Sequence, residues 1–211
     1  MKGILSLLKM KARSGKPSDD HTDSVLFSTA FAGQGVDDST LVPWEARAVE
    51  VGAKRLPTSR GGKLLQGLWA KDKYMAHLDK DAVERMERFF EFAAVPSNRD
   101  VIRQDEYGNF MVVLLTGTIA VDRVQPWGEQ LRLAETRPGD ILGEMSLLDS
   151  GIRFSACTTL TDCEIAVLSA EAMDDMMTKD PQLAASLIAL LARKLSLRLR
   201  VVSARLSDNN K

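Results

Sequence analysis

The sequence is poor in the residues that build metal and redox centres. It contains two histidines, His21 and His77, and two cysteines, Cys157 and Cys163. Transition metals are held by clustered imidazole, thiolate and carboxylate groups, so neither a metal centre nor an imidazole base is expected. The cysteines stand among strand-like residues without Cys-x-x-Cys spacing. We therefore expect two buried, reduced thiols rather than a disulfide or redox pair.

Long apolar runs and an excess of one charge are also missing. Unbroken apolar runs such as Phe110 to Leu115 are far shorter than the ~20 residues that span a bilayer. The N-terminus lacks the apolar region and cleavage site of a secretory signal. A formal net charge of −1 gives no electrostatic reason for bulk binding of nucleic acid. We expect a cytoplasmic protein without a cofactor.

The N-terminal part of the chain shows no sustained period. Residues 14–62 are rich in Ser, Gly, Asp, Thr and Pro, so residues 1–62 are expected to form a largely irregular extension. A short helix is possible at Pro43–Val51. Residues 1–13 mix apolar and basic side chains. They suit a helix that docks on a membrane surface or partner, although so short a helix is marginal alone and a frayed terminus is the alternative.

Beyond residue 62 the chain first follows a helical period and then a strand period. Apolar residues recur at helical spacing from Leu64 to Met75, and Asp79 can cap a second helix that runs through Phe92. Residues 95–169 switch to period two, with turn residues between short segments. The expected strands are Asp100–Gln104, Phe110–Thr116, Thr118–Val124, Gln130–Glu135, Phe154–Leu160 and Cys163–Leu168. Such spacing predicts a mainly β fold, an antiparallel β-roll (jelly roll) with flanking helices.

The C-terminal part is predicted to be helical. Ser169 can cap a helix from Ala170 to Thr178, and Asp180-Pro181 can start a second helix that ends near Leu206. Apolar residues of this last helix, between Ala184 and Leu206, follow a nearly heptad seam. At 1.5 Å per residue the helix is roughly 40 Å long, longer than a small β-domain covers. We expect a homodimer through Ala184–Leu206, with packing inside the chain as the alternative.

One stretch, Pro138–Ala156, breaks the strand pattern inside the roll. It begins with a turn, offers backbone amides after Gly143, and then supplies a carboxylate at Glu144 and a guanidinium at Arg153. Amides and an arginine can grip an anion, whereas a carboxylate accepts hydrogen bonds from hydroxyl groups. The stretch therefore suits a small ligand that carries both an anion and a sugar. A surface loop with a solvated Glu and Arg is the alternative.

With these residues in hand, roughly Leu78 to Leu206 resembles the cyclic-nucleotide-binding domains of catabolite activator proteins, protein kinase A regulatory subunits and cyclic-nucleotide-gated channels. The resemblance rests on several short motifs. They are Gln104-Asp105, Gly117-Thr118-Ile119-Ala120-Val121, Pro138-Gly139-Asp140, Gly143-Glu144-Met145-Ser146-Leu147-Leu148, Arg153 and Thr161-Asp162-Cys163-Glu164. It implies a binding domain over residues 63–211, with the roll at about 95–169 and C-terminal helices at 170–206.

The resemblance also implies roles for individual residues. Pro138–Ala156 would be a phosphate-binding cassette, in which Glu144 bonds the ribose 2′-hydroxyl and Arg153 pairs with the cyclic phosphate. The remaining candidates would supply amides after Gly143, apolar pocket walls and a polar group for the purine. In that order they are Met145 and Ser146, then Leu115 and Leu133, then Arg198.

Phe154 departs from the family pattern. Many members carry Ser, Thr or Ala directly after the cassette arginine, but here Phe154 follows Arg153 and Ser155-Ala156 come one place later. Either a β-bulge restores Ser155 to the site or one phosphate contact is missing. A missing charge-assisted bond weakens binding by about 1.5–3 kcal/mol.

These features favour a regulatory sensor over an enzyme. The expected ligand is cyclic AMP, with cyclic GMP and cyclic di-GMP as alternatives. The expected output is contact with an unknown effector protein, without direct DNA binding, because the chain stops after the long helix and no helix-turn-helix follows. A degenerate roll that binds no nucleotide and acts as a dimerising scaffold is the second hypothesis. A metal-dependent jelly-roll enzyme is disfavoured because no histidine falls between Lys80 and Lys211. A heme-bound gas sensor is disfavoured for the same shortage of ligands.

Overall fold

The computed structural model of the chain describes residues 26–75 and 78–208. The predicted helix at residues 1–13, and both histidines, lie outside these described residues. The helices are α1 Ser28–Gly33, the 3-10 helix η1 Asp38–Thr40, α2 Trp44–Glu50, α3 Thr58–Trp69, α4 Lys80–Glu87, α5 Glu144–Asp149, α6 Ala170–Lys179 and α7 Pro181–Asp208. The strands are β1 Lys54–Arg55, β2 Glu91–Val95, β3 Asp100–Ile102, β4 Phe110–Thr116, β5 Ile119–Val124, β6 Gln130–Glu135, β7 Ile141–Leu142, β8 Ala156–Thr159 and β9 Cys163–Ser169.

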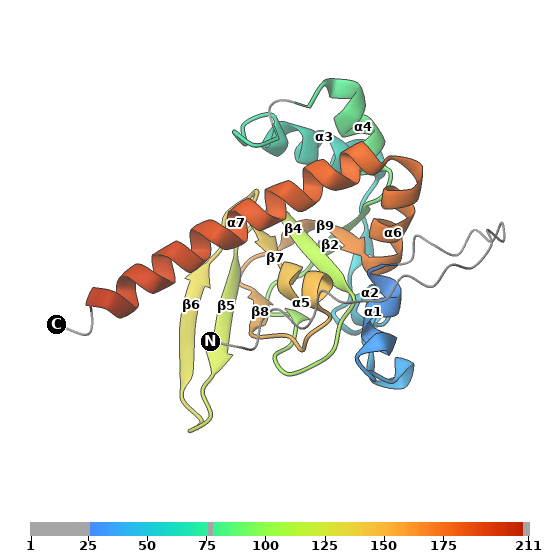
Figure 1. Ribbon diagram of the computed structural model, residues 1–211. Coiled ribbons are helices and arrows are strands. Elements are labelled where there is room, and N and C mark those ends of the chain that lie inside the picture. Colours follow the sequence, from blue (N-terminus) through green and yellow to red (C-terminus); the bar gives the residue numbers. More distant parts are fainter. Residues whose placement is uncertain (1–25, 76–77, 209–211) are drawn as a thin grey trace, which may run out of the picture.

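The strands form two antiparallel sheets that together make the predicted β-roll (Figure 1). The first sheet has the order β1-β2-β9-β4-β7, and the second has the order β3-β8-β5-β6. The longest pairing joins β4 to β9, from Phe110 opposite Ser169 to Thr116 opposite Glu164. Every strand pair in the described part of the chain is antiparallel. The predicted fold class is therefore confirmed.

The two faces of β4 explain why this strand is apolar throughout. Met111, Val113 and Leu115 point to a core shared with helices α3, α4, α6 and α7. The alternate residues Phe110, Val112 and Leu114 belong to a second core between the sheets. Since successive side chains of a strand point to opposite faces, a strand buried on both faces shows no apolar–polar alternation.

Both predicted helix caps are present, but one helix ends earlier than expected. The Asp79 carboxylate accepts a hydrogen bond from the Ala82 amide at 2.6 Å, and Ser169 Oγ accepts one from the Ala172 amide at 3.1 Å. The prediction that the Asp79-capped helix runs through Phe92 is wrong. Helix α4 ends at Glu87, and Phe92 lies in β2 opposite Ala166 of β9. Pairing with β9 decides this segment, because Phe92 gains both a core position and a ladder partner.

The described part of the N-terminal extension is more regular than expected. Residues 26–62 contain α1, η1, α2, β1 and the first turn of α3. Buried Asp174 of α6 anchors the start of this segment, since its carboxylate accepts hydrogen bonds at 2.8 Å from the backbone amides of Leu26, Phe27 and Ser28. The extension is therefore tied to the body rather than draped loosely over it.

Helix α7 is buried in its first half and exposed in its second. Ala184 and Leu191 of the predicted dimer seam are packed inside the chain, whereas Leu199, Val202 and Leu206 are exposed. In Figure 1 α7 extends across the molecule and its C-terminal end projects beyond β6. The seam predicted over Ala184–Leu206 is thus shared between packing in the chain and an open surface. No helix in the described part of the chain is long and apolar enough to cross a membrane.

Candidate functional site

The stretch that interrupts the roll forms a tight turn followed by a short helix. Strand β7 pairs with β4, and Gly143 follows it with φ of +75°, a conformation that favours glycine. A Cβ atom on Gly143 would lie 2.6 Å from Nη1 of Arg153, so the site also needs the small residue for space. Helix α5 then runs from Glu144 to Asp149. This turn places Glu144 and Arg153 in one buried region.

The Arg153 side chain is buried and bonded to backbone oxygens. Only 3% of its surface is exposed. Its Nη1 donates a hydrogen bond to the Gly143 carbonyl oxygen at 2.8 Å, and Nη2 donates one to the Phe110 carbonyl oxygen at 2.6 Å. The Phe110 ring lies 4.7 Å from the guanidinium carbon. Main-chain acceptors therefore hold the guanidinium of Arg153, the group predicted to bind an anion, in a fixed position.

Glu144 is equally buried and pairs with the long C-terminal helix. Nη1 of Arg198, on α7, forms an ion pair with Glu144 Oε1, and Nη2 donates a hydrogen bond to the Ile141 carbonyl oxygen at 2.8 Å. The structure brings Arg198 to the cassette, where its guanidinium contacts the carboxylate predicted to hold the ribose. This ion pair places α7 over the cassette.

The other predicted residues differ in accessibility. Ser146 is buried, Met145 is exposed and Ser155 is half-buried. Leu115 lies in the core between the first sheet and the helices, whereas Leu133 is exposed on β6. These two leucines therefore do not face one common space in the ligand-free protein.

Phe154 does not lie buried between Arg153 and Glu144. Half of its surface is exposed, and the guanidinium carbon of Arg123 lies 4.0 Å from its ring centroid. Strand β8 pairs with β5 from Ala156 to Thr159 without a shift in register. This regular pairing begins at Ala156 and does not include Ser155. The irregularity of the neighbouring pairing lies on β3, between Asp100 and Ile102.

Burial dominates the electrostatics of the site. It lowers the pKa of Arg153 to about 10, an effect to which the positive charge of Arg47 adds. Burial also raises the pKa of Glu144, while the charges of Arg198, Arg153 and Lys194 act against that rise. Burial raises the pKa of the neighbouring Cys157 thiol to about 12. The site therefore combines a buried cation and a buried carboxylate, each partly compensated by charges from other elements.

Several residues at the site escaped prediction because their contacts are long-range. Phe110 is 43 positions from Arg153 in the sequence, and Arg123 is 31 positions from Phe154. Gly108 makes room for Arg153, since a Cβ there would lie 2.8 Å from Nε. Only Gly108 carried a sequence signal, as a glycine in the predicted turn before β4.

The described residues contain no group of three or more His, Cys, Asp or Glu side chains arranged to hold a metal ion. A crevice of about 380 Å³ lies between α2, β1 and β2. None of the predicted site residues lines this crevice.

An antiparallel roll, interrupted by a glycine turn and a short helix and followed by a long helix, defines a class of ligand-binding regulatory domain. The comparison with known families agrees with this class. Residues 93–180 match the family described as "Cyclic nucleotide-binding domain".

The similar proteins include a cyclic AMP receptor protein. The chain is 31% identical over 107 residues to the cyclic AMP receptor protein of Thermus thermophilus, a match that covers 51% of this chain and 50% of that protein. The matched segment thus spans about half the length of this relative. The crystal structure of the Thermus thermophilus catabolite activator protein is similar with a TM-score of 0.54 and 28% identity over 63% of each chain. A cyclic nucleotide-binding domain from Methylobacillus flagellatus has a TM-score of 0.67 at 22% identity and shares the fold, over 72% of this chain and 86% of that one.

Proposed function

We propose that the roll and α7 bind a purine cyclic nucleotide, and that the protein is a regulatory sensor rather than an enzyme. The observation that carries this proposal is the convergence of Arg153, Glu144 and Arg198 beneath one helix. Arg153 would pair with the cyclic phosphate and Glu144 with the ribose 2′-hydroxyl. Arg198 would meet the purine when it leaves Glu144. Cyclic AMP is the expected ligand because a similar protein, the Thermus thermophilus cyclic AMP receptor protein, carries its name.

Binding would be an exchange of partners at Arg153. A guanidinium carries five N–H donors, and the carbonyl oxygens of Gly143 and Phe110 use two of them. Donors therefore remain for a phosphate oxygen, although the group must become accessible. A ligand can shift α7 only by its difference in affinity between the closed and opened arrangements.

The scaffold that binds no nucleotide remains a second candidate because the site is internally satisfied. Arg153 has two main-chain acceptors, and Glu144 has an ion pair with Arg198. Such a domain would keep its fold and its surface without a ligand. Phe154 does not fill the space between Arg153 and Glu144, since half of its surface is exposed and its ring lies beside Arg123. Internal pairing is therefore the support for this hypothesis.

Calorimetry with cyclic AMP, cyclic GMP and cyclic di-GMP tests the proposal. Arg153→Ala should weaken binding by about 1.5–3 kcal/mol, roughly tenfold to over a hundredfold, because it removes charge-assisted bonds to the phosphate. Arg60→Ala is the matched control, since it removes the same charge from an exposed ion pair with Glu164. Wild-type protein that binds none of the three nucleotides would support the scaffold. Binding that Arg153→Ala leaves unchanged would contradict the assigned role of Arg153.

We further propose that the output runs through protein contacts, in a homodimer joined by the exposed half of α7 and with an effector protein of unknown identity. The two reduced, buried thiols support a cytoplasmic location, because reducing compartments keep cysteines free.

A further inference from the structure

The N-terminal segment Leu26–Leu56 lies outside the family match at residues 93–180, yet it contacts the chain beside Arg153. The Val42 amide donates a hydrogen bond to the Tyr107 carbonyl oxygen at 2.9 Å. Tyr107 forms one bridge with Leu41 and another with Ile152, the residue directly before Arg153. The segment thus forms an outer layer on the loop that precedes β4.

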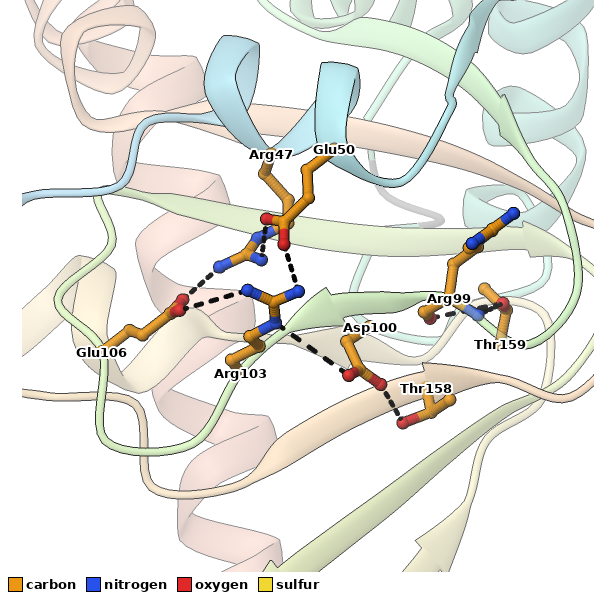
Figure 2. Close-up of polar contacts among 8 residues, drawn as sticks. All are labelled: Arg47, Glu50, Arg99, Asp100, Arg103, Glu106, Thr158 and Thr159. Atoms are coloured by element: carbon orange, nitrogen blue, oxygen red, sulfur yellow. Dashed lines mark hydrogen bonds and ion pairs between the residues drawn. The ribbon is translucent and has the colours of Figure 1, made fainter.

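Side chains of α2 continue this contact into the body of the protein. Arg47 is only 1% exposed, and its guanidinium forms ion pairs with Glu50 and Glu106. Figure 2 shows Arg47 and Glu50 pointing from α2 toward Arg103, which contacts Glu50, Glu106 and Asp100. The Asp100 carboxylate then accepts a hydrogen bond from the Thr158 hydroxyl at 2.7 Å. Helix α2 is therefore linked to the second sheet through two arginines and three carboxylates.

Two paths lead from α2 to Arg153. In the first, Arg47 holds the Glu106 side chain, and the Glu106 carbonyl oxygen accepts a hydrogen bond from the Arg153 amide at 2.8 Å. In the second, Trp44 packs edge-on against Phe110, with ring centroids 5.6 Å apart. Phe110 in turn supports the Arg153 guanidinium with its ring and its carbonyl oxygen. Arg47 and Arg153 also lie around the same closely packed spot, together with Glu106 and Phe110.

We propose that Arg47 is a positioning residue for Arg153, and that the N-terminal segment is therefore part of the nucleotide site. This inference rests on the proposed function, in which Arg153 binds the cyclic phosphate. By holding Glu106, Arg47 fixes the main chain of Arg153 and sets where its guanidinium lies. The positive charge of Arg47 adds to the field that an arriving phosphate meets.

A purely structural role would not require an arginine at this position. Replacing a buried ion pair by well-packed apolar side chains is often neutral for stability, so burial alone gives no reason for a guanidinium. The Arg47 Nε atom is buried and has no hydrogen-bond partner among the described residues. The planar guanidinium of Arg47 instead forms ion pairs with Glu50 and Glu106 at the same time.

The test compares Arg47→Met with Arg47→Lys and Arg99→Met. Arg47→Met keeps length but removes charge and donors, and Arg47→Lys keeps charge without the fork. Arg99→Met is the matched control, because Arg99 is exposed and its side chain points away from the network in Figure 2. Affinity for cyclic AMP and cyclic GMP should fall about tenfold in Arg47→Met, recover partly in Arg47→Lys and stay unchanged in Arg99→Met.

Hydrogen exchange in the ligand-free protein gives a readout that needs no nucleotide. The Arg153 and Asp105 amides, which bond across the two loops, should exchange about tenfold faster in Arg47→Met. Amides of β4 serve as the internal reference. Glu106→Gln tests the same link from its other end, and it replaces Arg47→Met if that variant does not fold.

The outcomes separate this inference from the proposed function. Weaker binding and faster Arg153 exchange in Arg47→Met and Glu106→Gln, with neither in Arg99→Met, support the positioning role. The positioning role is overturned if the wild-type protein binds a nucleotide but Arg47→Met and Arg99→Met have the same affinity and the same Arg153 exchange rate. If the wild-type protein binds none of the three cyclic nucleotides, the proposed function fails, and the exchange measurement alone supports or overturns the link.

Discussion

Cys157 and Cys163 are buried in the roll with 3% and 2% of their surface exposed. Burial raises the pKa of Cys157 to about 12 and also raises the pKa of Cys163. Because the thiolate is the reactive form, neither thiol should react in the folded protein at pH 8. A chromogenic thiol reagent should detect both cysteines in denaturant and neither in native protein on the same timescale. Prompt reaction of native protein would contradict the burial of these residues.

The carboxyl group of Glu144 should make stability depend on pH in a predictable direction. Burial raises its pKa, and Arg198 is the strongest charge acting against that rise. Arg198→Ala should therefore raise the pKa further and cost about 1–3 kcal/mol at pH 7, because a buried carboxylate loses a partner. A carboxyl group with a raised pKa binds its proton more tightly when folded. Stability should then recover as the pH falls from the raised pKa toward the ordinary value.

Denaturant unfolding at pH 7 and pH 5 checks this expectation. The loss of stability caused by Arg198→Ala should be smaller at pH 5 than at pH 7. Arg193→Ala, five residues earlier on α7, is the control, since the Arg193 guanidinium lies over the Tyr74 ring at 5.0 Å from its centroid. An equal loss at both pH values would show that Glu144 does not lose its charge in this range.

At the residue scale the sequence predicts the chemistry of the site better than its contacts. Glu144 and Arg153 could be chosen from one contiguous stretch, because their spacing around a turn is local. The acceptors of Arg153 and the partner of Glu144 could not be chosen. Phe110 and Arg198 reach the site from distant elements, and their approach depends on how those elements pack.

At the element scale, strands bounded by clear turn residues were predicted most closely. The bounds of β4 and β6 match the expected Phe110–Thr116 and Gln130–Glu135. The first two residues of β2 fall in the helix predicted through Phe92, because Val83, Met86, Phe89 and Phe90 form a helical stripe just before them. Strands β1 and β7 have two residues each, too few for any period to show. Pairing with distant strands, which a local pattern cannot reveal, defines these elements.

The apolar seam of helix α7 covers two surfaces, one packed in the core of the chain and one exposed. Its apolar seam was expected to face a second copy of the chain from Ala184 to Leu206. Instead, Ala184 and Leu191 complete the core that β4 shares with the helices, and the seam is open only after the Arg198 contact. The periodicity predicted an apolar face, but it could not divide that face between an intrachain core and a partner.

At the scale of the whole molecule, two parts of the chain leave the compact roll. The N-terminal segment returns to the cassette through α2, while the C-terminal half of α7 projects from the body (Figure 1). Exposed apolar residues concentrate on that projecting half. They are Leu197, Leu199, Val201, Val202 and Leu206. Such a surface on a helix that has left its own core favours pairing with the same helix of a second copy.

Charge substitutions on this surface test the proposed homodimer. Leu199→Glu with Val202→Glu should convert the dimer to a monomer, because two carboxylates would be buried without partners at the interface. Light scattering coupled to size-exclusion chromatography measures the mass directly. Val49→Glu is the matched control, since Val49 is 84% exposed on α2, away from the α7 surface. The control should keep the mass of the wild type. A wild-type protein that is monomeric at protein concentrations of about 1 μM or above would contradict the homodimer. The exposed half of α7 would then be available to an effector protein.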